Sequence, residues 1–345
     1  MAAALAVLTA CEYEFDNGAL TDETSIYVES IVSNSDTNIL RIVKTLPYNT
    51  AEDVKDSANL NVTKVSSIEL LRDGARQEVF YADSPVGSVA RGRYYTLGGY
   101  KPGEKLSLKV EMEGEKKVSA ETVIPEDAGW SFKVAELDNG DDKDIGKFHI
   151  DINFDNTPEC DDFYGIKMEV RSTETYYNED GSENTYYSYT FTYNANPSID
   201  EGDDIEEIMS GEGDSHVFEY NDIYLFDDSS LKSGRNTISY DTYMGQHRYF
   251  FEQVATKGYG DSDWQYPVRV HTEIKYKLSL YTLSRELYRW YASRYNASYN
   301  ALAELGLCPP SFAYGNVKDG IGCFAGRLCT ASEWVVVKDE WSDLE

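Results

Sequence analysis

Residues 101–126 read KPGEKLSLKVEMEGEKKVSAETVIPE and contain two strand patterns around a turn. Pro102-Gly103 predicts a turn before the first strand, and Glu113-Gly114 predicts the turn between the two strands. Residues suited to a buried face occupy every second position on both sides of that turn, as the period of a β-strand requires. These positions are Leu106, Leu108, Val110, Val118, Ala120, Thr122 and Ile124. Pro125 ends the second strand, because proline cannot donate a hydrogen bond to a ladder.

Residues 66–82 (SSIELLRDGARQEVFYA) predict a hairpin of the same kind upstream. Asp73-Gly74 supplies the positive φ angles that a tight turn between two strands needs. Further strand patterns occur at residues 25–32 (SIYVESIV) and 39–46 (ILRIVKTL). Several short strands at this spacing predict an immunoglobulin-like β-sandwich over residues 25–125.

A larger β-rich domain is predicted over residues 126–345. The stretch GKFHIDINFD at 146–155 alternates apolar and polar residues, and residues 175–194 (TYYNEDGSENTYYSYTFTYN) predict a hairpin around Asp180-Gly181. A last strand is expected at residues 334–337. The predicted fold class is therefore mainly β, with an N-terminal immunoglobulin-like β-sandwich followed by a larger β-rich domain that contains one C-terminal helix.

That helix is predicted near residues 284–305. Ser284 is a suitable N-cap, Gly306 is a suitable stop, and Pro309-Pro310 prevent continuation. Bulky side chains recur at helical spacing and predict one buried face. They are Leu287, Trp290, Tyr291, Tyr295, Tyr299 and Leu302.

Residues 1–11 end in Leu8-Thr9-Ala10-Cys11, which fits the cleavage site of a bacterial lipoprotein signal. Small residues fit the peptidase at the cut, and the Cys11 thiol would accept a diacylglycerol. No Lys or Arg precedes the apolar stretch, so we interpret it as the remnant of a signal peptide. Residues 12–24 would then form an acidic tether to the bilayer, because two or more acyl chains give stable anchoring. The alternative is an ordinary free cysteine near the terminus.

Four further cysteines, Cys160, Cys308, Cys323 and Cys329, are candidates for disulfide bonds. An exported protein meets an oxidising compartment, and four cysteines allow three pairings. A local loop between Cys323 and Cys329 is one of them, with Cys160 and Cys308 closing a long loop. A zinc site is disfavoured, because the sequence has no C-x-x-C pair and no histidine near these cysteines.

The net charge of −30 comes from 61 acidic and 31 basic residues. So negative a surface repels a phosphate backbone, so nucleic acid is not an expected partner. The charge is consistent with solubility and with attraction of cations. No window of 18 apolar residues occurs, so no transmembrane helix is predicted.

The sequence predicts no enzyme and no cofactor. It lacks H-E-x-x-H, G-x-S-x-G, a Walker loop and G-x-G-x-x-G. Its four histidines, His149, His216, His247 and His271, are scattered. Asp138, Asp142 and Asp144 are weak candidates for a calcium site, since hard cations prefer oxygen ligands. A solvated acidic loop is the preferred interpretation, because these residues lack the EF-hand order.

The 28 tyrosines are the remaining signal. Tyrosine offers a rigid apolar face and a polar tip, which suits contact surfaces and stacking on a sugar or peptide. Several tyrosines of the predicted hairpin at 175–194 form a candidate binding surface. They are Tyr176, Tyr177, Tyr186, Tyr187 and Tyr189. The alternative is that they fill the core and coat a sheet, where aromatic residues are favoured anyway.

The chain resembles a family of Bacteroidetes lipoproteins that carry domain of unknown function 4249. The resemblance rests on the lipoprotein-type site at Cys11, the sandwich pattern ending near TVIPE, and two late stretches. These are LYTLSRELYRWYASRY at 280–295 and CPPSFAYGNVKDGIGCFAGRLC at 308–329. Acidic residues after the cysteine, such as Glu12, Glu14 and Asp16, look like a surface-export signal of these bacteria.

The resemblance implies a signal-bearing lipoprotein of the outer membrane, exposed on the cell surface and encoded beside a TonB-dependent transporter. Its expected partners are that transporter, the bilayer through acylated Cys11, and a small nutrient ligand. The expected function is accessory: to bind oligosaccharide or peptide during nutrient uptake, or to stabilise the transporter complex. The alternative is a structural surface protein such as an adhesin or a pilus-like component.

Overall fold

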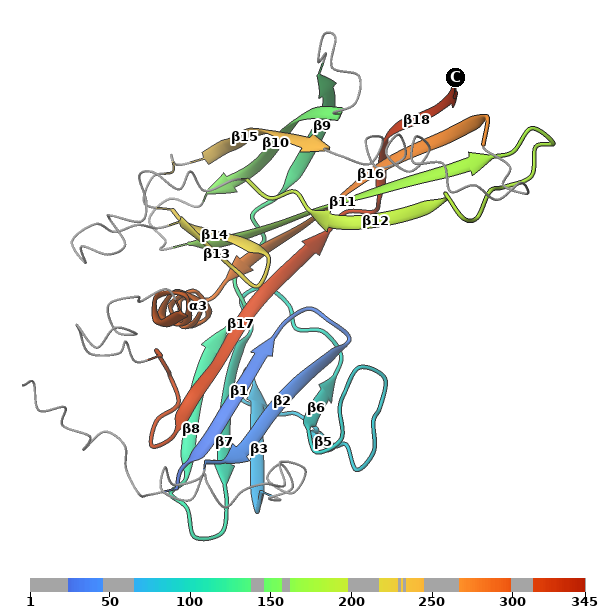
Figure 1. Cartoon of the computed structure of the whole chain (residues 1–345). Helices are drawn as coiled ribbons and strands as arrows, with labels where there is room; N and C mark the ends of the chain where they lie inside the picture. Colours follow the sequence, from blue (N-terminus) through green and yellow to red (C-terminus); the bar gives the residue numbers. More distant parts are fainter. Residues whose placement is uncertain are drawn as a thin grey trace, which may run out of the picture.

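A computed structural model gives the fold of residues 24–45, 65–137, 146–156, 162–197, 217–228, 231, 234–244, 267–298 and 313–344. These residues form three β-sheets and one helix, so the prediction of a mainly β protein with a helix near its C-terminus is confirmed (Figure 1). Within the described residues, no helix is long and apolar enough to span a membrane.

The largest sheet has eleven strands and runs through the whole molecule. Its main path is β13 (Val217–Tyr220), β14 (Ile223–Asp227), β11 (Phe163–Tyr177), β16 (Arg269–Leu283), β17 (Ile321–Ala331), β1 (Ile26–Val32), β2 (Thr37–Lys44), β6 (Tyr94–Leu97) and β5 (Phe80–Tyr81). Two more strands join from the side: β12 (Tyr189–Asn194) pairs with β11, and β18 (Val335–Asp343) pairs with β16.

A four-stranded sheet packs against the β1–β2 end of the large sheet and encloses the first core. It consists of β4 (Ala75–Arg76), β3 (Ser67–Arg72), β7 (Lys105–Glu111) and β8 (Val118–Val123). Asp73 and Gly74 both have positive φ, which confirms the predicted turn, but β4 after it has only two residues, and Phe80 and Tyr81 pair with β6 of the large sheet instead of with β3. Gly114 turns the chain between β7 and β8, so that predicted hairpin is confirmed. The result is a sandwich of two β-sheets; its immunoglobulin-like character stays a prediction.

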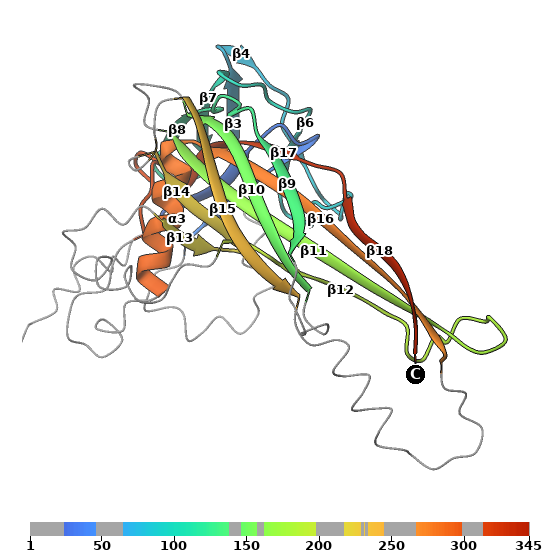
Figure 2. The ribbon, with the colours of Figure 1, turned by 90° about the horizontal axis from the view of Figure 1, so that it is seen from above.

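A three-stranded sheet covers the other half of the large sheet and encloses the second core. It consists of β15 (Gly234–Met244), β10 (Gly146–Asn156) and β9 (Ser131–Leu137). The alternating residues of β10 are fully buried against β11 and β16, as their pattern predicts. They are Phe148, Ile150, Ile152 and Phe154. Figure 2 shows this sheet lying across the base of β11 and β16, whose outer ends extend past it as an arm.

Strand β17 joins the two halves of the molecule. Its first part pairs in parallel with β1, and its last part pairs antiparallel with β16. Phe324 of β17 lies in the first core, while Cys323 and Ala325 pack on the opposite face against α3 (Arg285–Ser298). A strand late in the chain thus completes the sheet of the first sandwich. The division at residue 125 stays a prediction, and the large sheet is continuous across it.

Asn316 and Gly322 hold β17 close to its neighbours. The Asn316 side chain accepts a hydrogen bond from the Phe324 N–H at 2.9 Å and donates to the Phe324 and Glu121 carbonyls at 2.8 and 3.2 Å. Gly322 has φ +112, and a Cβ there would lie 1.9 Å from the Val28 carbonyl oxygen. Only glycine allows both this backbone conformation and this approach. We call Asn316, Gly322 and Phe324 the junction.

Helix α3 begins where the sequence predicts. The Ser284 Oγ accepts a hydrogen bond from the Leu287 N–H at 3.3 Å, which confirms the N-cap. Leu287, Trp290 and Tyr291 are buried on the predicted face. The predicted end of the helix and Gly306 lie outside the described residues.

Candidate functional site: an aromatic tip

The candidate tyrosines lie at the outer end of the arm. Strands β11 and β16 pair antiparallel without interruption from Phe163↔Leu283 to Tyr177↔Arg269. The predicted turn forms next: the Gly181 N–H donates to the Asn178 carbonyl at 2.9 Å, and Gly181 has φ +80. The return strand begins only at Tyr189, so Tyr186 and Tyr187 lie in the loop before it.

We call the aromatic side chains gathered here the aromatic tip. They are Tyr176, Tyr177, Tyr186, Tyr187, Tyr189, Phe191 and Trp341. Side chains of a strand alternate between two faces. The inner face of the arm, which continues the second core, carries Tyr176, Tyr189 and Phe191. The outer face carries Tyr177 and Trp341. The structure thus brings together all five predicted tyrosines and adds two residues.

The half-buried carboxylate of Glu174 organises the inner face. Tyr176 is 1% exposed, and its hydroxyl donates to Glu174 Oε2 at 2.6 Å. The Tyr189 hydroxyl donates to the same oxygen. Burial, followed by this bond to Glu174, raises the pKa of Tyr189 far above its usual range. The hydroxyl therefore stays protonated as a donor, and Tyr176 is a core residue of the tip.

Tyr186 and Phe191 are the aromatic side chains that the inner side of the tip exposes to solvent. Tyr186 is 68% exposed and meets Tyr187 edge-on, with the ring centroids 5.1 Å apart. Phe191 is 42% exposed and packs against Tyr189 at 4.9 Å. Folding does not require two large aromatic side chains to be exposed to solvent at one end of an arm, so their exposure indicates a contact surface.

Trp341 dominates the outer face. Its ring centroid lies 5.0 Å from that of Tyr177 and 4.7 Å from that of His271, and His271 stacks on it with an interplanar angle of 27°. The Arg269 guanidinium lies 4.9 Å from the indole centroid. Trp341 is nevertheless 52% exposed. About half of the Trp341 side chain therefore remains open to solvent.

Sequence reasoning missed Trp341, because it expected the last strand to end at Val337. The strand β18 continues to Asp343, and its register places Trp341 opposite His271. The register shifts between Ile274 and Lys275, which no pattern in the sequence indicates. The sequence does contain one indication that the strand continues: Asp339, Trp341 and Asp343 stand at every second position after the predicted end.

The charged side chains around Trp341 are paired with one another. The His271 Nε2 lies 2.6 Å from Asp339 Oδ1, and the Arg269 Nε lies 3.1 Å from Asp343 Oδ1. Farther along the same face, the Lys275 ammonium lies 2.6 Å from the Glu273 carboxylate. The cations Arg269 and Lys275 on this face are therefore each paired with a carboxylate.

The predicted disulfide bond between Cys323 and Cys329 does not form. Cys323 and Cys329 carry free thiols, and both lie on β17. Six residues of strand span about 20 Å, well beyond the reach of a disulfide, so the predicted local loop between them is wrong. Burial raises the pKa of Cys323 to about 12, which makes it an inert core thiol. Cys11, Cys160 and Cys308 lie outside the described residues.

Metal binding gains no support from the described part of the chain, which contains no cluster of three or more His, Cys, Asp or Glu side chains that could hold an ion. The candidates Asp138, Asp142 and Asp144 lie outside it. His149 sits on the exposed face of β10, where Asp241 at 2.8 Å and Asp151 at 3.2 Å raise its pKa. It therefore serves as an ion-pairing residue of the sheet surface.

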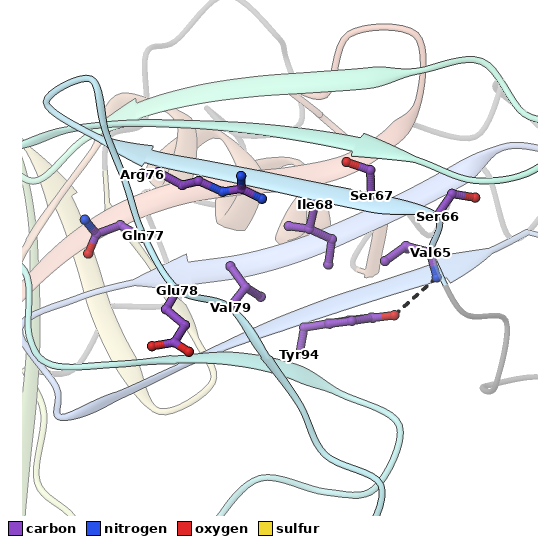
Figure 3. A pocket seen from close by; sticks show the side chains of 9 residues that line it. All are labelled: Val65, Ser66, Ser67, Ile68, Arg76, Gln77, Glu78, Val79 and Tyr94. Atoms are coloured by element: carbon purple, nitrogen blue, oxygen red, sulfur yellow. Dashed lines mark hydrogen bonds between the residues drawn. The ribbon is translucent and has the colours of Figure 1, made fainter.

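A hollow of about 540 Å³ in the first sandwich is another feature that could receive a ligand (Figure 3). Ile68, Val79 and Tyr94 line its apolar part, and the Tyr94 hydroxyl accepts a hydrogen bond from the Val65 N–H at 3.2 Å. Arg76 and Glu78 are the charged residues of its lining. None of the predicted site residues lies there, so the aromatic tip remains the better candidate.

The fold and the tip define a mainly β protein whose most distinctive surface is a group of aromatic side chains at the end of a long hairpin. The chain belongs to the family described as domain of unknown function (DUF4249), whose model matches residues 10–329. This confirms the domain of unknown function that the sequence resembles, while the bacterial group, the lipid anchor and the transporter stay predictions. Trp341 lies beyond the matched residues. No curated protein matches the chain.

Proposed function

We propose that this protein is a lipoprotein, anchored through acylated Cys11 to the outer membrane of a Bacteroidetes bacterium and exposed on the cell surface. There it acts as a non-enzymatic accessory protein of a TonB-dependent nutrient transporter. It binds oligosaccharide or peptide for uptake, or stabilises the transporter complex. The first sandwich, which we take to be immunoglobulin-like, is the docking or spacing module, and the second half carries the recognition surface.

The observation that carries this proposal is the position of the aromatic tip relative to the start of the chain. Strand β1 begins at the end of the molecule opposite the arm (Figure 1). A tether over residues 12–24 would therefore hold the first sandwich near the bilayer and leave the tip pointing away from it. Exposed aromatic side chains give large, rigid contact area at a low cost in conformational entropy, which suits capture of a ligand or partner.

The second candidate function is a structural surface protein, such as an adhesin or a pilus-like component. In the described part of the chain, β12 pairs only with β11 and β18 pairs only with β16. Each strand therefore offers an edge to which another chain could add a strand. Aromatic side chains at the tip favour the accessory role, because strand addition needs backbone edges and not exposed rings.

The test is a pull-down of the tagged full-length precursor from native outer membranes, followed by mass spectrometry. We expect a TonB-dependent transporter to be recovered with the wild-type protein. We expect Cys11→Ser to release the protein from envelopes and to lose the transporter. Recovery of pilin-like subunits in place of a transporter would support the structural alternative. Retention of Cys11→Ser in the envelope would contradict the anchor.

A further inference from the structure

The outer face of the arm presents two tryptophans along one line. Trp341 lies near the end of β18, and Trp334 directly precedes that strand. The Arg171 guanidinium, from the outer face of β11, lies 4.2 Å from the Trp334 ring centroid, which places Trp334 on the same face. Seven residues of strand separate the two indoles, a distance of about 20 Å. A ligand that touches both must be an extended chain.

Trp341 has the geometry of a stacking platform. His271 and Arg269 pack on the indole, and Tyr177 extends the aromatic surface toward β11. The side chain is 52% exposed although it is held on three sides. A ring fixed in this way loses little entropy when a ligand covers it. Its electron-rich face attracts the weakly positive C–H bonds of a sugar ring.

Threonine side chains lie on β11 and β12, beside the line that joins the tryptophans, and the Glu273–Lys275 ion pair of β16 lies between these strands and β18. Thr173 and Thr190 face each other across β11 and β12, with their Oγ1 atoms 3.1 Å apart. Thr192 accepts a hydrogen bond from the Arg171 Nε at 3.4 Å. Thr175 lies beside His271 in the ladder. Donors and acceptors of this kind can bond sugar hydroxyls without contributing charge.

The charges of this face disfavour a strongly charged ligand. The Arg269 guanidinium beside Trp341 is already paired with Asp343, and the His271 ring is already bonded to Asp339. The whole chain has a net charge of −30, which repels polyanions. A neutral, hydroxyl-rich ligand would leave these ion pairs in place and would lose no ionic hydration.

We propose that the outer face of the arm binds a neutral polysaccharide chain, which stacks on Trp341 and Tyr177 and runs over the threonines toward Trp334. This inference rests on the proposed accessory function and deepens it by naming the ligand class and the face that binds it. Polysaccharide binding is measured with the purified protein alone. Failure to recover a transporter in the pull-down would therefore contradict the accessory function without testing polysaccharide binding.

The experiment is affinity electrophoresis in native gels that each contain an α-glucan, a β-glucan, a mannan or a galactan. At least one of these polysaccharides is expected to retard the wild-type protein. Trp341→Ala is expected to raise the dissociation constant calculated from the retardation about tenfold or more, because it removes a central aromatic anchor. Trp341→Phe keeps part of the ring face and gives an intermediate value. The matched control is Leu97→Ala, which removes an exposed apolar side chain of β6 in the first sandwich and leaves retardation unchanged. Tyr186→Ala is measured beside it to test the inner side of the tip.

Thermal unfolding of each variant shows that the fold is retained. Unretarded wild-type protein in all four gels would overturn the proposal, and so would equal retardation of wild type and Trp341→Ala. Loss of retardation in Tyr186→Ala but not in Trp341→Ala would place the ligand on the inner side and would also overturn it. A fifth gel contains the anionic polymer polygalacturonate. If it retards the protein more strongly than any neutral polysaccharide does, the proposed ligand class is contradicted.

Discussion

The junction buries its bulky side chain, whereas the aromatic tip exposes bulky side chains to solvent. At the junction, Phe324 is fully buried and Gly322 lies against the Val28 carbonyl with no room for a Cβ. At the tip, Trp341 and Tyr186 are more than half exposed. Packing therefore dictates which residues can occupy the junction, whereas folding alone does not require large rings at the tip. Side chains that folding does not require are the ones to examine for binding.

The largest expected effect is that of Gly322→Ala. The new Cβ would lie 1.9 Å from the Val28 carbonyl oxygen, and φ +112 is strained for alanine. Because the contact is with backbone, β1 and β17 would have to separate. We expect a loss of at least about 3 kcal/mol in the free energy of unfolding, measured by urea denaturation.

The matched control for that change is Gly181→Ala in the turn of the tip. Gly181 also has positive φ, +80, but nothing lies within 4 Å of the position that an added Cβ would take. Only the backbone strain remains, which costs about 1–2 kcal/mol. Equal destabilisation by the two variants would show that close approach at the junction adds nothing to the strain.

Asn316→Ala is expected to have the next largest effect. Its side chain satisfies the N–H and the carbonyl of Phe324 and also bonds the Glu121 carbonyl of β8. Truncation leaves these backbone groups without partners between packed strands, at a cost of about 2 kcal/mol. Urea denaturation measures the loss. A change below that of a typical surface substitution, about 0.5 kcal/mol, would mean that water replaces the side chain at no cost.

The sequence predicted the parts of the fold that depend on local pattern. The hairpins at Asp73-Gly74 and Asp180-Gly181 and the N-cap at Ser284 each depend on residues close together in the chain. The parallel pairing of β1 with β17 could not be predicted, because its partners lie at opposite ends of the sequence and either strand could satisfy its hydrogen bonds elsewhere. The stretch around Asn316 looked like a family signature, and its physical role emerged only with that pairing.

The same division applies to the candidate site. The tyrosines of residues 175–194 were found because they share one hairpin. Which of them are buried was not predicted: Tyr176 is buried on the inner face of the arm, and Tyr186 lies exposed in a loop. Trp341 reaches Tyr177 only through the register of β16 and β18, which includes a shift. Contacts that depend on register between distant strands lie beyond pattern reasoning.

Tyr189→Phe tests the inner face of the tip through the pH dependence of the free energy of unfolding. Burial and the bond to Glu174 raise the Tyr189 pKa in the folded protein above the unfolded value of about 10. Its contribution to stability is full below pH 10 and is lost as pH rises, because the unfolded chain releases the proton first. Between about pH 10 and 11, the free energy of unfolding should fall by about 1 kcal/mol more in wild type than in the variant, and the extra slope approaches about 1.4 kcal/mol per pH unit above pH 11.

At neutral pH the same variant loses only a hydrogen bond, about 1 kcal/mol. Urea denaturation at several pH values measures both effects. Parallel pH profiles for wild type and Tyr189→Phe would contradict the buried tyrosine–carboxylate arrangement, whatever the difference at neutral pH.

Tyr186→Ala should have the smallest effect on stability. The ring is 68% exposed and contacts Tyr187 edge-on, so its removal leaves no cavity. We expect the free energy of unfolding to change by less than about 0.5 kcal/mol in urea denaturation. A loss near that of Asn316→Ala would show that the tip is built by the same packing as the junction. The exposed rings would then need no explanation from binding, and the contrast between the two regions would disappear.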